Sequence, residues 1–181
     1  MTIFVSGGCK NGKSTYAQRL AKSLEAKSHS PLYYIATMDP HDDEDNARIA
    51  RHLRERAGWG FETLEQPRDL CALLGKTGGA GVYMLDSVTA LVANEMFPYP
   101  EIDLAAGERV AGDIKRFLAS VQDAVLVSDF IYSGDGCYEG LTDDYLRALA
   151  LCDRTAAKYC DCVLEVACGN VICHKGAAPC I

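Results

Sequence analysis

The chain has 181 residues, a length that suits one domain with a substantial core, and we expect residues 1–181 to form a single unit. The formal net charge of −7 argues against a nonspecific nucleic-acid binder, because such proteins normally carry a basic face. No stretch approaches the roughly 20 apolar residues of a membrane-spanning helix, and the first residues lack the features of a signal peptide. We therefore expect a cytoplasmic protein without a membrane span.

Strand and helix patterns alternate along the chain. The predicted strands are residues 2–6, 32–37, 61–65, 81–86, 124–128, 162–167 and 171–174. The predicted helices are residues 13–26, 44–57, 68–75, 87–97, 104–121 and 142–159. Continuously apolar strands are typical of a parallel sheet with helices on both faces, so we expect a three-layer α/β domain. Gly169-Asn170 predicts a C-terminal hairpin that makes one sheet edge antiparallel and places Glu165 opposite His174.

The first predicted strand leads directly into a phosphate-binding pattern. Its residues are Gly7, Gly8, Cys9, Lys10, Asn11, Gly12, Lys13 and Ser14, with the glycine and Lys-Ser spacing of a P-loop. Glycine lets such a loop curl its N–H groups around phosphate oxygens, and the helix that follows points its positive end at the same anion. Lys13 can reach the β- and γ-phosphates of ATP or GTP, and the Ser14 hydroxyl can ligate Mg²⁺. The pattern predicts a P-loop NTPase-like fold.

The predicted helix 44–57 carries a histidine beside its apolar stripe. Ile49, Ala50, Leu53 and Ala57 form that stripe, which we expect to face the core. Arg48 and His52 are one turn apart on its flank, where the arginine could neutralise a phosphate. A neutral imidazole there could attack the α-phosphate of a nucleotide. From spacing alone, a surface histidine on a charged helix is the stronger interpretation.

Two acidic residues follow apolar strands. Asp86 ends the run Val82-Tyr-Met-Leu-Asp, the position at which P-loop proteins place a carboxylate in the Mg²⁺ shell. The alternative role is the N-cap of the next helix. Asp129 ends another apolar strand in the same way and is a weaker candidate for the metal.

The sequence contains nine cysteines, four of which lie close together between positions 160 and 173: Cys160, Cys162, Cys168 and Cys173. Cys162 and Cys168 stand at the two ends of a predicted strand, roughly 20 Å apart, whereas the ligands of one zinc must converge on it. We therefore expect buried thiols that act as small hydrophobes.

Several of these motifs occur together in one known family. The P-loop, then Tyr34-Ile-Ala-Thr37, then Ala47-Arg48-Ile49-x-x-His52 resemble the bifunctional adenosylcobinamide kinase / adenosylcobinamide-phosphate guanylyltransferase family of cobalamin biosynthesis. The resemblance continues through Trp59, Glu65-x-Pro67 and the segment from Asp86 to Asn94, and it covers roughly the first hundred residues.

This resemblance implies a transferase with two activities. The enzyme phosphorylates the aminopropanol hydroxyl of adenosylcobinamide with a nucleoside triphosphate, then accepts GMP from GTP on His52 and passes it to adenosylcobinamide phosphate. The catalytic residues implied are His52 and Lys13, with Mg²⁺ held by Ser14 and Asp86. The partners implied are a small corrinoid and, as in the family, two further copies of the chain in a homotrimer.

The second half departs from the family pattern. Asp129-Phe130-Ile131-Tyr132 replaces the usual stretch after the fifth strand, and Arg56-Ala57 replaces an Arg-Pro pair. Two alternatives therefore stay open. One is a P-loop small-molecule kinase without guanylyltransferase activity, and the other is a nucleotide switch that makes no product.

Overall fold

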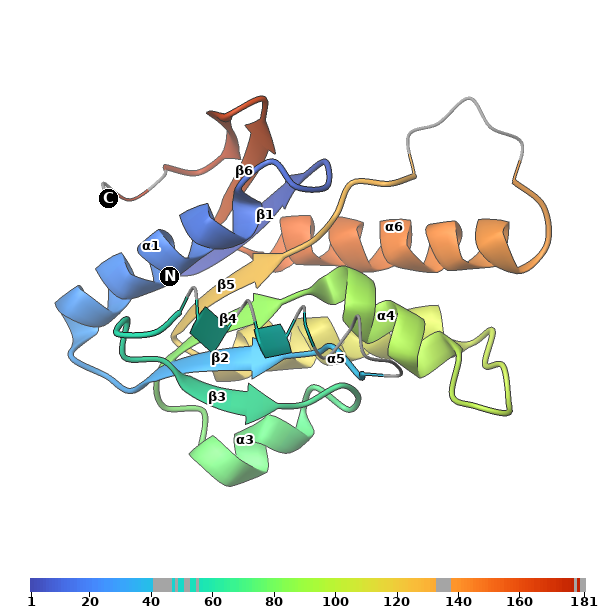
Figure 1. Cartoon of the computed structure of the whole chain (residues 1–181), viewed down its shortest axis with the longest axis horizontal. Coiled ribbons are helices and arrows are strands. Elements are labelled where there is room, and N and C mark those ends of the chain that lie inside the picture. Colours follow the sequence, from blue (N-terminus) through green and yellow to red (C-terminus); the bar gives the residue numbers. More distant parts are fainter. Residues whose placement is uncertain are drawn as a thin grey trace.

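A computed structural model of the chain describes residues 1–40, 47, 49–50, 53–54, 56–132, 138–177 and 179. These residues form one sheet of seven strands in the order β3-β2-β4-β5-β1-β6-β7 (Figure 1). The strands are Thr2–Gly7 (β1), Leu32–Ala36 (β2), Glu62–Glu65 (β3), Val82–Asp86 (β4), Asp123–Val127 (β5), Cys162–Ala167 (β6) and Asn170–Lys175 (β7). All neighbouring pairs are parallel except β6 and β7, as the sequence predicts.

The described helices follow the predicted order. They are Lys13–Ser28 (α1), Ala72–Thr77 (α3), Val88–Met96 (α4), Ala106–Ser120 (α5) and Leu141–Tyr159 (α6). Half of the predicted helix 44–57 lies outside the described residues, and the described positions 47, 49, 50, 53 and 54 are helical. In the part of the chain that the structure describes, no helix is long and apolar enough to cross a membrane.

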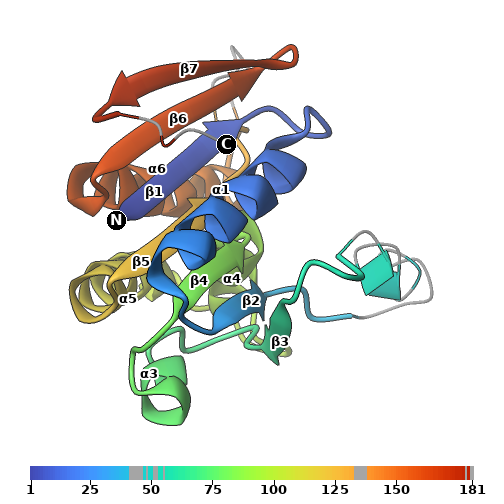
Figure 2. The same ribbon diagram turned by 90° about the vertical axis from the view of Figure 1, so that its left-hand side faces the viewer.

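The sheet is buried on both faces. Along β1, Ile3 and Val5 pack toward α1, whereas Phe4 packs toward the layer formed by α4, α5 and α6. Figure 2 shows α1 on one side of the sheet and these three helices on the other. This alternation follows from the two-residue period of a strand, and it makes the domain the three-layer α/β structure that the apolar strands predict.

The C-terminal hairpin forms with a different register from the predicted one. Cys168 and Gly169 make the turn with φ values of 51° and 79°, the backbone conformation of a tight type I′ hairpin. This turn places Glu165 opposite Ile172, not His174. A bulge after this point brings the His174 ring back toward Glu165, so that Nε2 lies 2.8 Å from Oε2. Glu165 and His174 therefore form the predicted pair, although they are not register partners.

The cysteines near the C-terminus are buried only in part. Cys160 and Cys162 belong to the core, in agreement with the prediction, but Cys168 and Cys173 are exposed. Cys173 is exposed because it lies on β7, the edge strand, which no further element of the described chain covers, and Cys168 is exposed because it lies in the hairpin turn.

Candidate functional site

The carboxyl ends of the parallel strands bring the predicted nucleotide-binding residues to one edge of the sheet. Ala36, Asp86, Val127 and Val5 are partners in register across β2, β4, β5 and β1. Neighbouring strands are about 4.8 Å apart, so the Cα atom of Asp86 lies roughly 10 Å from that of Val5, just before the P-loop. Ligands of open α/β sheets bind at this edge.

The P-loop is fixed to β6. The Asn11 side-chain amide donates to the Val166 carbonyl, and a Cβ at position 7 would overlap the same oxygen. Gly7 and Gly12 have φ values of 149° and 91°, which side chains disfavour. The two glycines therefore allow the loop to press against β6 and to turn into α1.

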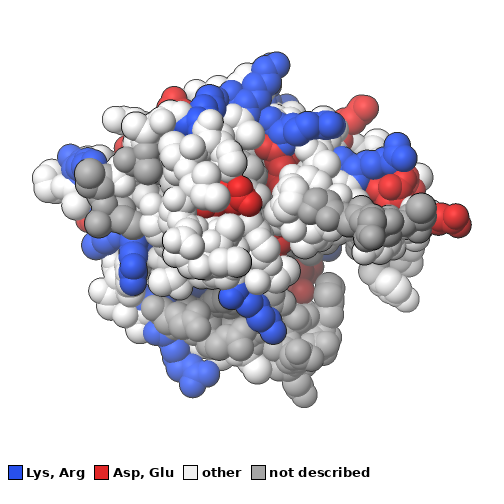
Figure 3. All heavy atoms as spheres, turned by 90° about the horizontal axis from the view of Figure 1, so that it is seen from above, with Lys and Arg blue, Asp and Glu red and all other residues white. Residues whose placement is uncertain are grey.

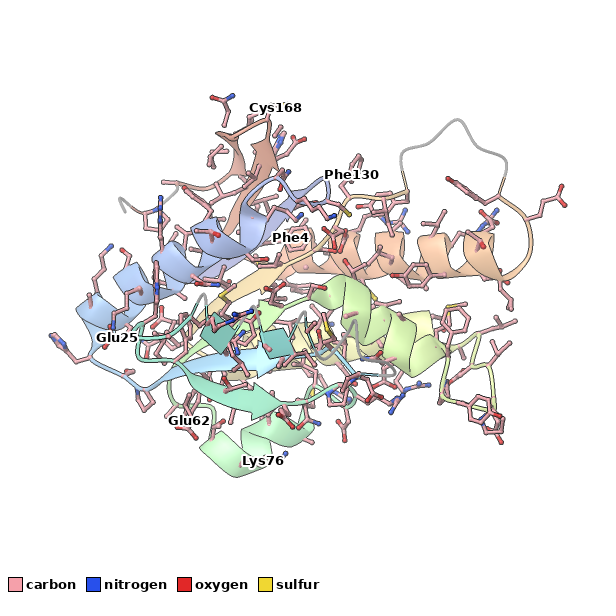
Figure 4. All side chains as sticks on the ribbon, viewed as in Figure 1. Phe4, Glu25, Glu62, Lys76, Phe130 and Cys168 are labelled. Carbon is pink, nitrogen blue, oxygen red and sulfur yellow. The ribbon has the colours of Figure 1, made fainter. Side chains whose placement is uncertain are left out.

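Lys13 is buried and points back into its own loop. Its Nζ donates to the Gly8 carbonyl at 2.6 Å and to Asp129 Oδ1 at 2.8 Å, and the residue is 5% exposed. Asp129 is held by a backbone bond from Phe130 to the Gly7 carbonyl (2.9 Å), and Figure 4 shows Phe130 beside the loop between β1 and α1. The Asp129 carboxylate is thus paired with Lys13, the residue that the sequence predicts to bind phosphate.

Asp86 takes part in a second polar contact. The Tyr34 hydroxyl donates to Asp86 Oδ2 at 2.8 Å, and the Arg56 guanidinium lies 3.6 Å from the centre of the Tyr34 ring. Burial and the nearby carboxylate raise the pKa of Tyr34 well above its ordinary value, so the phenol remains a proton donor. Arg56 is itself buried and donates to Thr63 Oγ1 at 3.2 Å.

The alternative role of Asp86 as a helix cap is wrong. The N-cap of α4 is Ser87, whose hydroxyl accepts from the backbone N–H of Ala90 at 3.2 Å. Ser87 also shares hydrogen bonds with the buried Thr37 hydroxyl at the end of β2. Because Ser87 caps the helix, the Asp86 carboxylate stays at the end of β4.

A third carboxylate lies deeper, behind Asp129. Asp153 of α6 is 2% exposed, and the Tyr132 hydroxyl donates to its Oδ2 at 3.0 Å. Within the described residues, Asp153 Oδ1 has no hydrogen-bond partner. The hydroxyls of Ser128 and Tyr132 both lower the pKa of Asp153. Burial outweighs both hydroxyls and raises the pKa of Asp153 to about 6.

The predicted residues of the histidine helix are placed only in part. His52 and Arg48 lie outside the described residues. The expectation that the apolar stripe faces the core is wrong for the described residues, since Leu53 is 48% exposed and Ala50 and Ala57 are also exposed. Leu53 lies with Arg56, Phe61 and Thr63 around an open cavity of about 440 Å³. Leu53 and Ala57 of the predicted stripe therefore line this open cavity, Ile49 is half-buried, and Arg56 is the buried residue of the cavity wall.

The charges of the described residues are mixed over the face seen in Figure 3. Lys and Arg side chains are scattered among acidic ones, and those in view do not gather into one broad basic patch. Cys9 and Lys10 are exposed at the tip of the P-loop, whereas Ser14 is half-buried in the first turn of α1.

A parallel sheet with a glycine-rich loop between β1 and α1, and an aspartate at the end of β4, defines a P-loop nucleotide-binding domain. The ATPase domain of G40P has this fold, with a TM-score of 0.59 over 98% of this chain and 78% of that one, at 12% identity. The particular family follows from sequence: the model of the cobinamide kinase / cobinamide phosphate guanyltransferase family matches residues 3–173. The chain belongs to that family.

Two relatives show how far the similarity extends. The bifunctional adenosylcobalamin biosynthesis protein CobP of Pseudomonas aeruginosa is 40% identical over 96 residues, which cover 52% of each chain. The protein CobU of Escherichia coli, with the same description, is 32% identical over 130 residues, covering 67% of this chain and 68% of that one. The chain thus spans about half the length of the first relative and about two thirds of the second.

Sequence reasoning missed three residues of this edge. Tyr34 is part of a motif quoted for the family, but no role was assigned to it, and Arg56 was noted only beside a missing proline. Asp153 lies in a helix far along the chain, and nothing in its local sequence indicates that it is buried. A tyrosine two residues before the end of a strand is the one signal that could have indicated the contact with Asp86.

Proposed function

We propose that this chain phosphorylates the aminopropanol hydroxyl of adenosylcobinamide with ATP or GTP, and then transfers GMP from GTP to the phosphorylated product. The observation that carries the proposal is the gathering of Lys13, Asp86 and Asp129 at one edge of the sheet, in a chain of this family. The edge offers a cation for phosphate and carboxylates for a metal ion.

At the phosphate-binding end of the site, different residues bind the triphosphate and the metal ion. The loop amides and Lys13 bind the triphosphate, which displaces Asp129 from the lysine. The donor set fits Mg²⁺, since the Ser14 hydroxyl and the Asp86 carboxylate are hard oxygen ligands and Tyr34 uses only one Asp86 oxygen. Mg²⁺ bound there would neutralise charge that develops on the phosphate oxygens.

We assign GMP transfer to His52. The neutral imidazole attacks the α-phosphorus of GTP, a nitrogen–phosphorus bond forms, and pyrophosphate leaves. A phosphate oxygen of adenosylcobinamide phosphate then attacks the same phosphorus, and the imidazole leaves. Arg48, one helical turn earlier in the sequence, is assigned to neutralise the phosphate that is transferred.

The proposal extends to the setting of the enzyme. We expect a cytoplasmic protein in which residues 1–181 fold as one domain, a corrinoid as the small-molecule partner, and no nucleic-acid partner. We also expect a homotrimer, because the family to which the chain belongs is trimeric. Sedimentation of the purified protein measures the last point.

Labelling with GTP carrying a labelled α-phosphate tests the assignment of His52. With Mg²⁺, we expect an acid-labile, alkali-stable adduct on the wild type, none on His52→Ala and none on Lys13→Ala. His52→Ala should keep much of the kinase activity, whereas Lys13→Ala should lose both activities because each needs a bound triphosphate.

The other outcomes identify the alternatives. Phosphorylated corrinoid without any labelled protein would make the chain a kinase alone. Nucleotide binding without product or label would make it a switch protein. Equal loss of both activities in a folded His52→Ala variant would contradict the role of the histidine.

A further inference from the structure

One tyrosine connects the proposed metal ligand to the segment that follows His52. Tyr34 on β2 and Asp86 on β4 are diagonal neighbours, because Ala36 is the register partner of Asp86. The Tyr34 hydroxyl lies 2.8 Å from Asp86 Oδ2, and the Arg56 guanidinium lies 3.6 Å from the ring centre. Arg56 comes four positions after His52 in the sequence.

These contacts are built into the protein interior. Tyr34 is 3% exposed and Arg56 is 7% exposed, so both are held away from solvent. The Phe61 ring packs edge-on against Tyr34 with centroids 5.9 Å apart, and Thr63 on β3 accepts a hydrogen bond from Arg56. A desolvated guanidinium over an aromatic face is a favourable and directional contact. The ring therefore has one orientation, and its hydroxyl has one target.

We propose that Tyr34 and Arg56 are positioning residues for the metal site: Arg56 fixes the Tyr34 ring, and the Tyr34 hydroxyl holds Asp86 through Oδ2, which would leave Oδ1 to bind the cation. The inference rests on the proposed function, because it takes Asp86 as a metal ligand. As a consequence, the Tyr34 side chain contacts both Arg56, which follows His52 in the sequence, and Asp86, the proposed metal ligand. Both transfer steps then use one prearranged carboxylate.

The test measures how much Mg²⁺ is needed for nucleotide binding, using a fluorescent GTP analogue and no corrinoid. We expect Tyr34→Phe to raise the half-saturating Mg²⁺ concentration roughly 10-fold, the lower end of the roughly 10- to 100-fold loss of metal affinity that follows removal of a residue that orients a metal ligand. Arg56→Met should produce a shift in the same direction. Arg56→Lys should not restore wild-type behaviour, because lysine keeps the charge but not the planar stack.

Tyr83→Phe is the matched control. Tyr83 is also fully buried, and its hydroxyl donates to Thr77 at 2.6 Å, far from Asp86 along the strand direction. This variant loses a comparable buried hydrogen bond, so it reports the general cost of such a loss. Its Mg²⁺ dependence should equal that of the wild type, while thermal melts of all variants establish that they are folded.

The outcomes separate this inference from the proposed function. If Asp86→Asn shifts the Mg²⁺ dependence but Tyr34→Phe does not, or if Tyr83→Phe shifts it equally, the inference is overturned and the metal assignment stands. If Arg56→Met leaves it unchanged while Tyr34→Phe shifts it, the part assigned to Arg56 is overturned. If Asp86→Asn leaves it unchanged, the metal assignment fails, and the inference fails with it.

Discussion

Asp153 is a carboxyl group that the fold keeps from water. Its folded pKa of about 6 lies above the ordinary value of 3.8, and burial is the largest cause. The folded protein therefore binds more protons than the unfolded chain between about pH 4 and pH 6. The contribution of this group to stability is fully present below pH 4 and is lost as the pH rises through 6.

We expect Asp153→Asn to become more stable relative to the wild type as the pH rises from 4.5 to 7. The relative gain should be about 1–3 kcal/mol, at about 1.4 kcal/mol per unit of pKa shift. Urea unfolding at several pH values measures it. Asp161→Asn is a control of opposite sign at lower pH: bonds from Thr2 lower the pKa of Asp161 below its ordinary value of 3.8, so the contribution of this group to stability is lost only as the pH falls below that value. A flat difference for Asp153→Asn over this range would contradict the prediction.

For single residues, the sequence predicts those that belong to a contiguous motif. The P-loop is a contiguous pattern, so Lys13 and Asn11 could be selected before their contacts were known. The partner of Lys13 could not, because Asp129 is 116 positions away and its local sequence, an apolar strand followed by an acid, indicates at most a weaker metal ligand and no contact with the lysine. Predicting the contacts of Tyr34 and Arg56 would have required knowing that β2 pairs with β4 and where the chain runs after His52.

Elements were predicted more completely than their contacts. Each predicted strand is present, and so is each predicted helix apart from 44–57, which is described only in part, because hydrophobic periodicity extends over the whole element. The helix predicted at residues 68–75 instead begins at Ala72. Asp69 has a φ of 49°, and its N–H donates to Glu95 on α4, so the chain is fixed in a turn there. The contact between Asp69 and Glu95 joins two distant segments, so the sequence around residues 68–75 does not indicate it.

The packing of α5 against α6 depends on a glycine. A Cβ at Gly107 of α5 would lie 2.7 Å from the Cβ of Ala148 on α6, whereas a Cβ at Gly112 on the same helix would meet no atom of the described residues within 4 Å. Gly107→Ala therefore pushes two packed helices apart. Gly112→Ala only removes the backbone freedom of a helical glycine.

We expect Gly107→Ala to lower the free energy of unfolding by about 1–3 kcal/mol. The matched variant Gly112→Ala should raise it by about 0.5–1 kcal/mol. Urea midpoints of the two variants measure both changes. Equal midpoints would indicate that α5 and α6 can separate without cost.

The order of the strands is a property of the whole molecule. β5 lies between the P-loop strand β1 and the strand β4 that ends in Asp86. Alternating strand and helix patterns predict the layers but not this order, because each crossover can return to either side of the sheet. The order decides which carboxylate is next to Lys13, and it is Asp129.

Nucleotide binding should stabilise the whole domain. A ligand at about 100 times its Kd adds about 2.7 kcal/mol to the folded state. For a domain of this size, this corresponds to a rise in Tm of roughly 5–10 °C. We expect that rise for the wild type with GTP and Mg²⁺, and none for Lys13→Ala. Differential scanning fluorimetry measures both, and an equal rise in the variant would place the bound nucleotide elsewhere.

The contact of the P-loop with β6 has a consequence for synthesis on the ribosome. Asn11 and the Val166 carbonyl that it contacts are 155 positions apart, so the loop leaves the ribosome long before the strand that supports it. A nascent chain would carry every residue of the phosphate motif without the surface against which the loop closes. On this basis, bound nucleotide stabilises the loop only after β6 has left the ribosome.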